Sequence, residues 1–234
     1  MLNDSSTRRM KGVIFDWDGV VIDSSSQHER SWEILAAEIS KPLPEGHFKL
    51  GFGKKNQVII PGILQWATDQ KEIQQLADRK EEIYRELVRE GGVQILPGSQ
   101  ELLVALREER VPAAVGSSTP RANLDAIFAA TGLDAYFQAV VCGDDVLNGK
   151  PAPDVFLLAA NKLGLPALDC LVIEDAHAGI EAAIRAKMPV LAVATTNRLQ
   201  DLYQATDAVE TLAGVTPVRL AEVFRRAGRL DSSN

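Results

Sequence analysis

A pair of acidic residues follows the first apolar run of the chain. Asp16 and Asp18 come directly after Gly12–Phe15 and are followed by Gly19. Such a run is typical of a buried parallel strand, and open α/β sheets bind ligands beyond the carboxyl ends of their strands. Two carboxylates this close repel each other, and a divalent cation relieves the repulsion. The motif therefore predicts a magnesium site, with a simple strand-ending turn as the alternative.

A second acidic pair ends a later apolar run. Glu174 and Asp175 follow Leu171–Ile173, ahead of a predicted helix. Because a second acidic strand end in a parallel sheet can face the first, these acids can join the earlier pair. Asp175 could instead serve only as a helix N-cap. The predicted magnesium ligands are Asp16, Asp18, Glu174 and Asp175.

Hydroxyl side chains end a third strand-like run. Ser117, Ser118 and Thr119 follow Ala113–Gly116, and Pro120 suits the first position of a helix. Backbone N–H groups and hydroxyls at such a helix start can bind an anion. N-capping of the helix by Thr119 is the alternative.

A lysine precedes another predicted helix. Lys150 lies within Asn148–Asp154, between a strand-like run and an apolar helical pattern. There its ammonium group could pair with a phosphoryl oxygen and with a carboxylate. Exposure to solvent, which is usual for lysine, is the alternative.

Apolar runs alternate with helical patterns along most of the chain. Runs at 139–142 and 190–194 resemble those already named, and helical spacing recurs at Leu102, Leu103 and Leu106 and at Phe156, Leu157, Ala160 and Leu163. Strand and helix in alternation predict an α/β fold with a parallel sheet covered on both faces. Residues 24–92 show only helical patterns. Their charged run from Lys71 to Glu90 is interpreted as a solvated helix face.

Composition excludes several classes of partner. The 234 residues carry a net charge of −7, with 46% hydrophobic residues, so neither nucleic acid nor an anionic membrane is expected. Cys142 and Cys170 lie in apolar runs without metal-ligand spacing, which favours a reducing cytoplasm. The first ten residues lack the apolar segment of a signal peptide. A monomer is favoured.

The order of these four motifs resembles that of the haloacid dehalogenase superfamily. The sequence DxDG, then a strand-ending serine, then Gly149-Lys150-Pro151, then Glu174-Asp175 spans nearly the whole chain. The segments 149–154 and 173–180 are similar to the subgroup containing β-phosphoglucomutase and phosphoglycolate phosphatase. The resemblance implies a Rossmann-like core at 1–23 and 93–234, with an inserted helical cap domain at 24–92.

The resemblance also implies a role for each motif residue. Asp16 would attack phosphorus and form an aspartyl-phosphate, while Asp18 would act as general acid and base. Ser117, the amide of Ser118 and Lys150 would hold the phosphoryl group. Asp16, Asp175 and the carbonyl of Asp18 would bind magnesium, with Glu174 supporting them through water. Dehalogenases of the superfamily lack an acid at the position of Asp18 and need no metal.

Cap residues are expected to contact the substrate. His28 resembles a substrate-side position of mutases and sugar phosphatases, and Trp32 is assigned to the cap core. The segment Lys49–Asn56 looks like a specificity loop, in which Gly51 permits close approach and Lys54 could meet a second anionic group. β-Phosphoglucomutases tend to carry an arginine there, so the lysines argue against mutase activity.

We therefore predict a magnesium-dependent phosphatase of a small phosphorylated metabolite, either a sugar phosphate or phosphoglycolate. The alternative is a β-phosphoglucomutase-like isomerase, in which a sugar hydroxyl replaces water as acceptor. A receiver-like signalling domain is a third hypothesis. Its usual length is about half that of this chain, and both Asp18 and the inserted helical block count against it.

Overall fold

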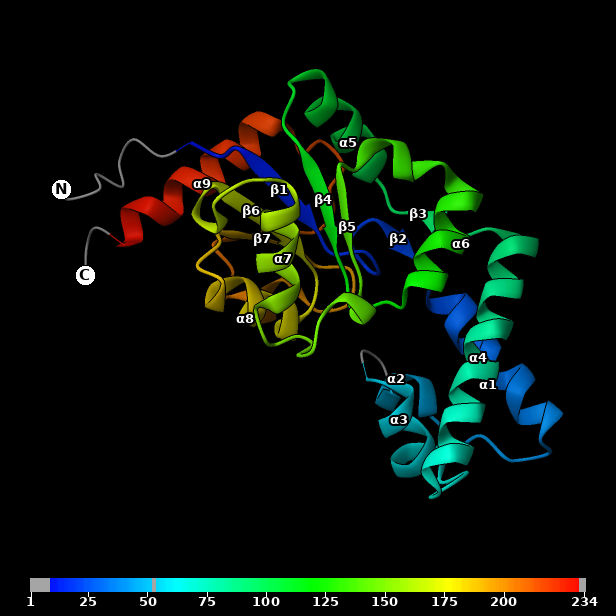
Figure 1. Cartoon of the computed structure of the whole chain (residues 1–234). Coiled ribbons are helices and arrows are strands. Elements are labelled where there is room, and N and C mark those ends of the chain that lie inside the picture. The colour runs from blue at the N-terminus through cyan, green and yellow to red at the C-terminus, as the bar shows by residue number, and fades with distance from the viewer. Residues whose placement is uncertain (1–8, 52–53, 232–234) are drawn as a thin grey trace. The chain divides into compact units, whose positions relative to one another are not determined.

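The computed structural model describes residues 9–51 and 54–231, and it divides into two compact units (Figure 1). An α/β unit comprises 1–23, 94–124 and 132–234, and a helical unit comprises 24–93 and 125–131. The helical block was expected at 24–92, so the structural unit is one residue longer there and also takes in 125–131.

The α/β unit is built on one six-stranded parallel sheet in the order β5-β4-β1-β6-β7-β8. Its strands are β1 (Gly12–Phe15), β4 (Ala113–Gly116), β5 (Ala139–Val141), β6 (Cys170–Glu174), β7 (Val190–Val193) and β8 (Asp207–Val209). The first five confirm the apolar runs and the predicted α/β class. The edge strand β8 was not predicted, because three half-buried residues beginning with Asp207 carry no continuous apolar signal.

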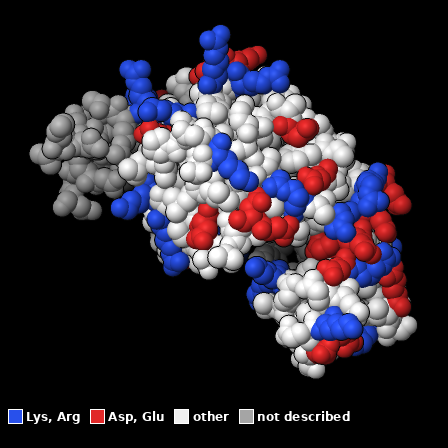
Figure 2. Space-filling model, in the orientation of Figure 1, with Lys and Arg blue, Asp and Glu red and all other residues white. Residues whose placement is uncertain are grey.

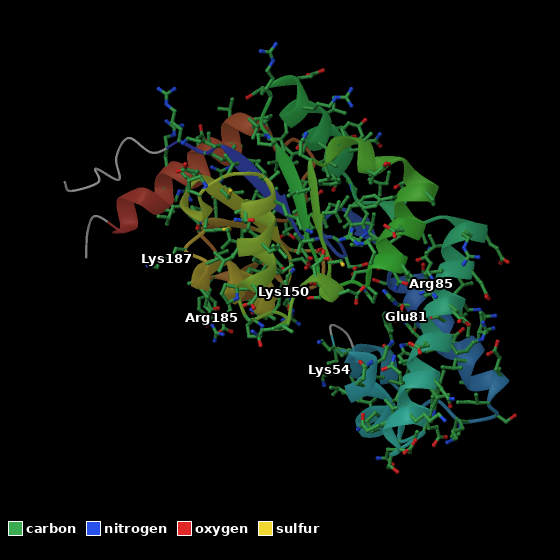
Figure 3. All side chains as sticks on the ribbon, viewed as in Figure 1. Lys54, Glu81, Arg85, Lys150, Arg185 and Lys187 are labelled. Carbon is green, nitrogen blue, oxygen red and sulfur yellow. The ribbon has the colours of Figure 1, made fainter. Side chains whose placement is uncertain are left out.

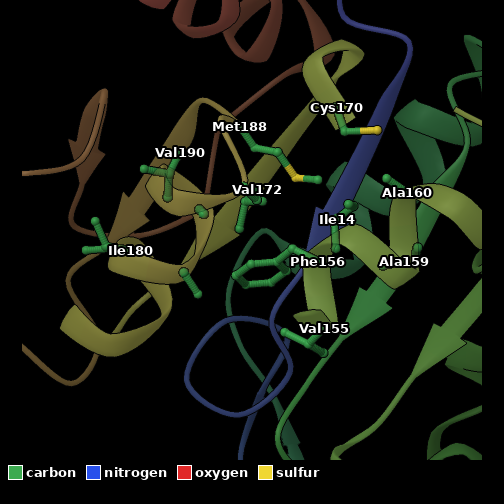
Figure 4. Packing of buried hydrophobic residues seen from close by; sticks show 14 of the residues in the cluster. Ile14, Val155, Phe156, Ala159, Ala160, Cys170, Val172, Ile180, Met188 and Val190 are labelled. Atoms are coloured by element: carbon green, nitrogen blue, oxygen red, sulfur yellow. The ribbon is translucent and has the colours of Figure 1, made fainter. Parts of the chain in front are cut away.

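Helices cover both faces of this sheet. On one face lie α7 (Asp154–Lys162) and α8 (His177–Arg185), and the other face is covered by α5 (Ser99–Glu108) and α9 (Pro217–Asp231), which contact each other. Because side chains alternate along a strand, Ile14 and Val172 join the core beneath α7 and α8 (Figure 4). Phe156 is fully buried there, packed with Ile180 and Met188 in the same cluster.

Shorter elements complete the α/β unit. Helix α6 (Arg121–Thr131) begins in it, and 3-10 turns occur at η3 (Leu133–Tyr136), η4 (Gly143–Asp145), η5 (Ala167–Asp169) and η6 (Leu199–Leu202). The two-residue strands β2 (Ile22–Asp23) and β3 (Gln94–Ile95) pair antiparallel, Ile22 with Ile95 and Asp23 with Gln94. This two-stranded ribbon pairs the segment just before the helical insertion with the segment just after it.

The helical unit has a core of its own. It contains α1 (Ser25–Glu38), α2 (His47–Gly51), α3 (Asn56–Val58), the π-helix η2 (Ile59–Leu64) and α4 (Gln70–Gly91). Trp32 is buried, as expected, and its ring meets that of Trp66 edge to face at 5.9 Å. The described residues of 24–92 form only helices and loops, which agrees with the helical pattern of the sequence.

The charged run of α4 is mostly solvated, with one exception. Charges of both signs are interspersed over this unit on the face shown in Figure 2. Arg79 pairs with Glu38 at 2.7 Å and with Glu82 at 3.2 Å on the exposed side. Lys80, however, is only 2% exposed, so interpreting the whole run as a solvated face was wrong at this residue. Its ammonium nitrogen lies 5.5 Å from the ring centre of Trp32 and 5.3 Å from that of Tyr84.

Both cysteines are buried thiols. Burial raises the pKa of Cys170 to about 12, and burial also raises the pKa of Cys142 above its ordinary value. Within the described part of the chain, the helices all fall short of the length and apolar character needed to cross a membrane.

Packing of Phe156 between the sheet and α8 predicts a large loss of stability on truncation. We expect Phe156→Ala to lower the free energy of unfolding by about 3–5 kcal/mol, because the ring leaves a cavity in a close-packed core. Chemical denaturation followed by circular dichroism measures this. The neighbouring Leu157, expected inside from the sequence, is 42% exposed and supplies the control. Leu157→Ala should change stability by only about 0.5 kcal/mol, and equal losses in the two variants would contradict the packing described.

Candidate active site

The carboxyl ends of three neighbouring strands bring the sequence motifs together. In the sheet register, Phe15 of β1 lies between Val115 of β4 and Ile173 of β6. The residues that follow these positions therefore meet at one edge: Asp16 after β1, Ser117 after β4 and Glu174 at the end of β6. The N–H of Asp16 donates to the carbonyl of Ile173 at 2.9 Å, which extends the ladder to the acid itself.

Lys150 links two of the acids. Its Nζ lies 2.8 Å from Asp16 Oδ1 and 2.7 Å from Glu174 Oε1, and its side chain is 8% exposed. Burial lowers the pKa of Lys150, but the charges of Asp16 and Glu174 outweigh burial, so the pKa is raised overall. Figure 3 labels this lysine in the loop before α7, where its ammonium group also lies 4.8 Å from the ring centre of Phe156. The alternative of an exposed lysine is therefore wrong.

Glu174 is anchored on both of its oxygens. While Oε1 accepts from Lys150, Oε2 accepts from the N–H groups of Asp175 and Ala176, each at 2.7 Å. The carboxylate packs against Gly179 so closely that a Cβ there would lie 1.5 Å from Oε1. Glycine in the first turn of α8 is thus a condition for burying this acid.

Asp16, Glu174 and Asp175 form a cluster that could hold a metal ion. Each offers one carboxylate oxygen, and these oxygens lie within 4.8 Å of one another. Burial raises the pKa of Asp16 to about 7, with Lys150 opposing the shift and Glu174 adding to it. Burial and the charge of Glu174 also raise the pKa of Asp175 well above its ordinary value. A divalent cation would stabilise all three carboxylates in their charged form.

The side chain of Asp18 lies outside this cluster. Its Oδ2 accepts a hydrogen bond from the hydroxyl of Thr119, in the loop after β4. Thr119 therefore holds Asp18 instead of capping α6, whose first N–H, that of Arg121, donates to Asp144 at 2.8 Å. The expected metal contact of Asp18 was through its backbone carbonyl, which stays a prediction.

Asp175 is held by a loop rather than by a helix start. Helix α8 begins at His177 with Ala176 as its N-cap, so the N-cap alternative for Asp175 is wrong. Thr196, in the loop after β7, donates its hydroxyl to Asp175 Oδ2 at 2.6 Å. The other side of the same oxygen faces Gly19, where a Cβ would lie only 2.0 Å away.

The loop after β4 offers hydrogen-bond donors to an anion. The Oγ of the buried Ser117 accepts from the N–H of Thr119 at 3.0 Å, which leaves its hydroxyl proton to point elsewhere. The N–H of Ser118 has no acceptor among the residues the structure describes. One hydroxyl and one backbone N–H, both next to Asp16 in the register, fit the predicted phosphate contacts.

The predicted cap residues belong to the helical unit. The ring of His28 stacks on Tyr84 at 4.1 Å, and its Nδ1 lies 2.6 Å from Lys80 Nζ. Gly51 is buried at the end of α2, and Lys54 is exposed. Figure 3 labels Lys54 and Glu81, and Glu81 accepts from Lys80 at 2.9 Å. Phe52 and Gly53, in the expected specificity loop, lie outside the described residues.

Sequence reasoning missed two groups of polar residues. Lys80 was hidden because its neighbours in the charged run are solvated, so no local pattern distinguishes it. Thr196 and Asn197 follow the apolar run of β7 in the same way as the other motifs follow their strands. That strand-end signal was present in the sequence, and it could have found them.

Proteins similar in sequence to this chain include two phosphatases and a mutase. The chain is 34% identical to a chloroplastic 5-amino-6-(5-phospho-D-ribitylamino)uracil phosphatase of Arabidopsis thaliana, covering 91% of this chain but only 57% of that longer protein. It is 34% identical to the fructose-1-phosphate phosphatase YqaB of Escherichia coli, over 79% of this chain and 97% of the relative. It is 33% identical to the β-phosphoglucomutase of Bacillus subtilis, over 76% of this chain and 81% of the relative.

The fold and a family model agree with these relatives. A solved hydrolase of family IA, variant 3, from Entamoeba histolytica superposes with a TM-score of 0.83 at 27% identity, covering 92% of this chain and all of that one. The model of haloacid dehalogenase-like hydrolases matches residues 10–187, which is well over half of the sequence and contains Asp16, Ser117, Lys150 and Glu174. The chain therefore belongs to the haloacid dehalogenase-like hydrolase family.

Proposed function

We propose that this protein is a magnesium-dependent phosphatase of a small phosphorylated metabolite, acting through an aspartyl-phosphate on Asp16. One observation carries the proposal. The carboxylate of Asp16 is fixed by Lys150 at a sheet edge where two further acids lie close enough to share a cation with it. A carboxylate held in this way, next to positive charge, can approach an anionic phosphate that would otherwise repel it.

Asp16 and Asp18 divide the chemistry between them. Asp16 attacks phosphorus, the P–O bond to the leaving group breaks, and Asp18 gives its proton to the departing oxygen. In the second half, Asp18 takes a proton from water, whose oxygen attacks the same phosphorus. The bond from phosphorus to Asp16 then breaks, which releases inorganic phosphate and regenerates both acids. The hydroxyl of Thr119 keeps Asp18 oriented through both halves.

Magnesium would be held by Asp16 and Asp175, with the carbonyl of Asp18 as a third ligand and Glu174 supporting through water. The oxygen donors of these groups suit a hard cation. When bound, the ion supplies positive charge that offsets the charge of the phosphoryl oxygens. Its charge would also oppose the burial and the neighbouring carboxylates that raise the pKa values of Asp16 and Asp175.

Ser117, Ser118 and Lys150 orient the phosphoryl group. The hydroxyl of Ser117 and the N–H of Ser118 donate to its oxygens, while Lys150 neutralises charge between the group and Asp16. Because Glu174 holds Lys150 from the far side, the ammonium group stays at the same place when Asp16 becomes esterified.

The helical unit is proposed to act as a cap that selects the substrate, through His28, Gly51 and Lys54. The proposed substrate is a sugar phosphate or phosphoglycolate. One of the similar proteins is a fructose-1-phosphate phosphatase. We propose a monomer. We also propose a reducing compartment such as the cytoplasm, because both cysteines are buried thiols.

A mutase is the second candidate, supported by the similarity to a β-phosphoglucomutase. It would share the aspartyl-phosphate and differ only in the acceptor, a sugar hydroxyl in place of water. Against it stands the exposed Lys54, since an ammonium group offers a phosphate one point charge where a guanidinium would bind it with two parallel hydrogen bonds.

Replacing the nucleophile should remove turnover without unfolding the protein. Asp16→Asn keeps the shape and an oxygen that can accept from Lys150, but an amide is a poor nucleophile. We expect hydrolysis of p-nitrophenyl phosphate to fall by at least about 1,000-fold, with the melting temperature kept. The exposed Asp201→Asn is the control and should retain activity. Activity of Asp16→Asn within tenfold of wild type would remove Asp16 from the central role.

Metal dependence should appear in stability as well as in rate. Magnesium at 100 times its Kd should stabilise the fold by about 2.7 kcal/mol, because it binds the folded acid cluster. A thermal melt with magnesium and with excess chelator measures this, alongside phosphate release. Asp175→Asn should lose most of the shift. Full turnover in chelator, with the metal content verified, would contradict the metal site.

The acceptor can be identified with one substrate. Given β-glucose 1-phosphate and a trace of the bisphosphate, the protein should release inorganic phosphate and form little glucose 6-phosphate. The reason is that a mutase must retain its bisphosphate intermediate, and the lysines of 54–55 hold phosphate less specifically than arginine. Both products are followed over time, and rapid glucose 6-phosphate formation with little phosphate release would establish the mutase instead.

A further inference from the structure

The loop after β7 contacts two of the site motifs at once. We call Thr195, Thr196 and Asn197 the β7 loop. Thr195 donates its hydroxyl to the carbonyl of Gly19, while Thr196 and Asn197 both bind Asp175. These three residues are consecutive, so a single short segment connects the loop after β1 to the loop after β6.

Within the β7 loop, the hydrogen bonds fix the direction of one proton. Asn197 Nδ2 donates to the carbonyl of Asp175 at 2.9 Å and to Thr196 Oγ1 at 3.1 Å. The hydroxyl of Thr196 therefore accepts from the amide, and its own proton points to Asp175 Oδ2 at 2.6 Å. Its longer contact, 3.1 Å to the Asp175 carbonyl, competes with the donor already there.

The same carboxylate oxygen is confined from the other side. Gly19 has φ of +79° and no Cβ, and a Cβ there would lie 2.0 Å from Asp175 Oδ2 and 3.3 Å from Oδ1. Thr196 and Gly19 thus enclose Oδ2. The second oxygen, Oδ1, is the one left for a cation, since the described residues provide it with no hydrogen-bond donor.

We propose that Thr196 and Asn197 are positioning residues that orient Asp175 as a metal ligand, an inference that rests on the function proposed above. Hydrogen bonds to a ligating side chain commonly set its orientation, and their removal costs about 10–100-fold in metal affinity. Without a hydrogen bond to one of its oxygens, the Asp175 carboxylate could present either oxygen to a cation. The hydroxyl of Thr196 holds Oδ2, which leaves Oδ1 as the oxygen that a cation shared with Asp16 would use.

The exposure of Thr196 separates this role from a structural one. Its residue is exposed, and the β7 loop lines an open hollow of about 430 Å³ formed by residues 194–200 and Glu210. Removing the hydroxyl therefore creates no cavity in a core, and the fold should tolerate the change. What changes is the orientation of Asp175, which itself is 3% exposed.

The test measures magnesium affinity in four proteins. Wild type, Thr196→Val, Thr196→Ser and Thr211→Val are titrated with magnesium, and the ion-dependent shift in melting temperature is recorded for each. Thr196→Val removes the hydroxyl at constant shape, and Thr196→Ser restores it. Thr211 is an exposed threonine of the same unit whose hydroxyl donates to Pro97, so it controls for the substitution itself. The magnesium dependence of p-nitrophenyl phosphate hydrolysis is measured in parallel.

We expect Thr196→Val to raise the half-saturating magnesium concentration about 10–100-fold in both measurements. Thr196→Ser and Thr211→Val should stay within about threefold of wild type, and kcat of Thr196→Val should recover at saturating magnesium. Asn197→Ala, which frees the Thr196 hydroxyl to rotate, should weaken magnesium binding to a smaller extent.

Three results would overturn the inference, and only the third also overturns the proposed function. If wild type shifts with magnesium and Thr196→Val behaves identically, the positioning role is wrong while the proposed function stands. The same holds if Thr196→Ser is as impaired as Thr196→Val, because then the hydroxyl is not what matters. If wild type shows neither a magnesium-dependent shift nor phosphatase activity, both this inference and the proposed function fail.

Discussion

The site depends on one ammonium group shared by two buried carboxylates. Lys150 lies within 2.8 Å of both Asp16 and Glu174, whose side chains are 13% and 0% exposed. Burying an ion pair costs desolvation energy, and removing one member leaves the other charge uncompensated, which costs more still. Of the three, Glu174 is the most firmly held, since two backbone N–H groups fix its second oxygen. The position of Lys150, and through it that of Asp16, follows from that anchor.

Asp175 leaves the cluster with more acidic groups than basic ones. With Asp175 added, three carboxylates face one lysine, and burial raises the pKa of both Asp16 and Asp175. The cluster therefore has an excess of negative charge when its acids are ionised, which is the electrostatic condition for binding a cation. The same carboxylates also require glycine at two neighbouring positions. Gly19 and Gly179 leave room for carboxylates that any side chain would displace.

The two units position polar groups in different ways. The parallel sheet of the α/β unit aligns strand ends, so that residues far apart in the sequence meet at one edge. The helical unit instead buries a second polar group, Lys80, between the rings of Trp32 and Tyr84 and beside His28. A buried polar group needs hydrogen-bond partners, and His28 and Glu81 of the same unit lie within 2.9 Å of the Lys80 nitrogen. Reaction chemistry and substrate choice are thereby proposed to reside in separately packed parts of the chain.

The sequence alone determined which strands are followed by candidate site residues, because continuous apolar runs followed by acids or hydroxyls are visible without a structure. Asp16, Ser117 and Glu174 were located in this way, Lys150 was located from its place before a predicted helix, and the helical insertion was located from its 3.6-residue spacing. Only the tertiary structure decided which atoms pair. Nothing local distinguishes Lys80 from its solvated neighbours, or shows that Thr119 binds Asp18 and Thr196 binds Asp175. These contacts join residues 21–101 positions apart, and their geometry comes from sheet register and loop packing rather than from spacing along the chain.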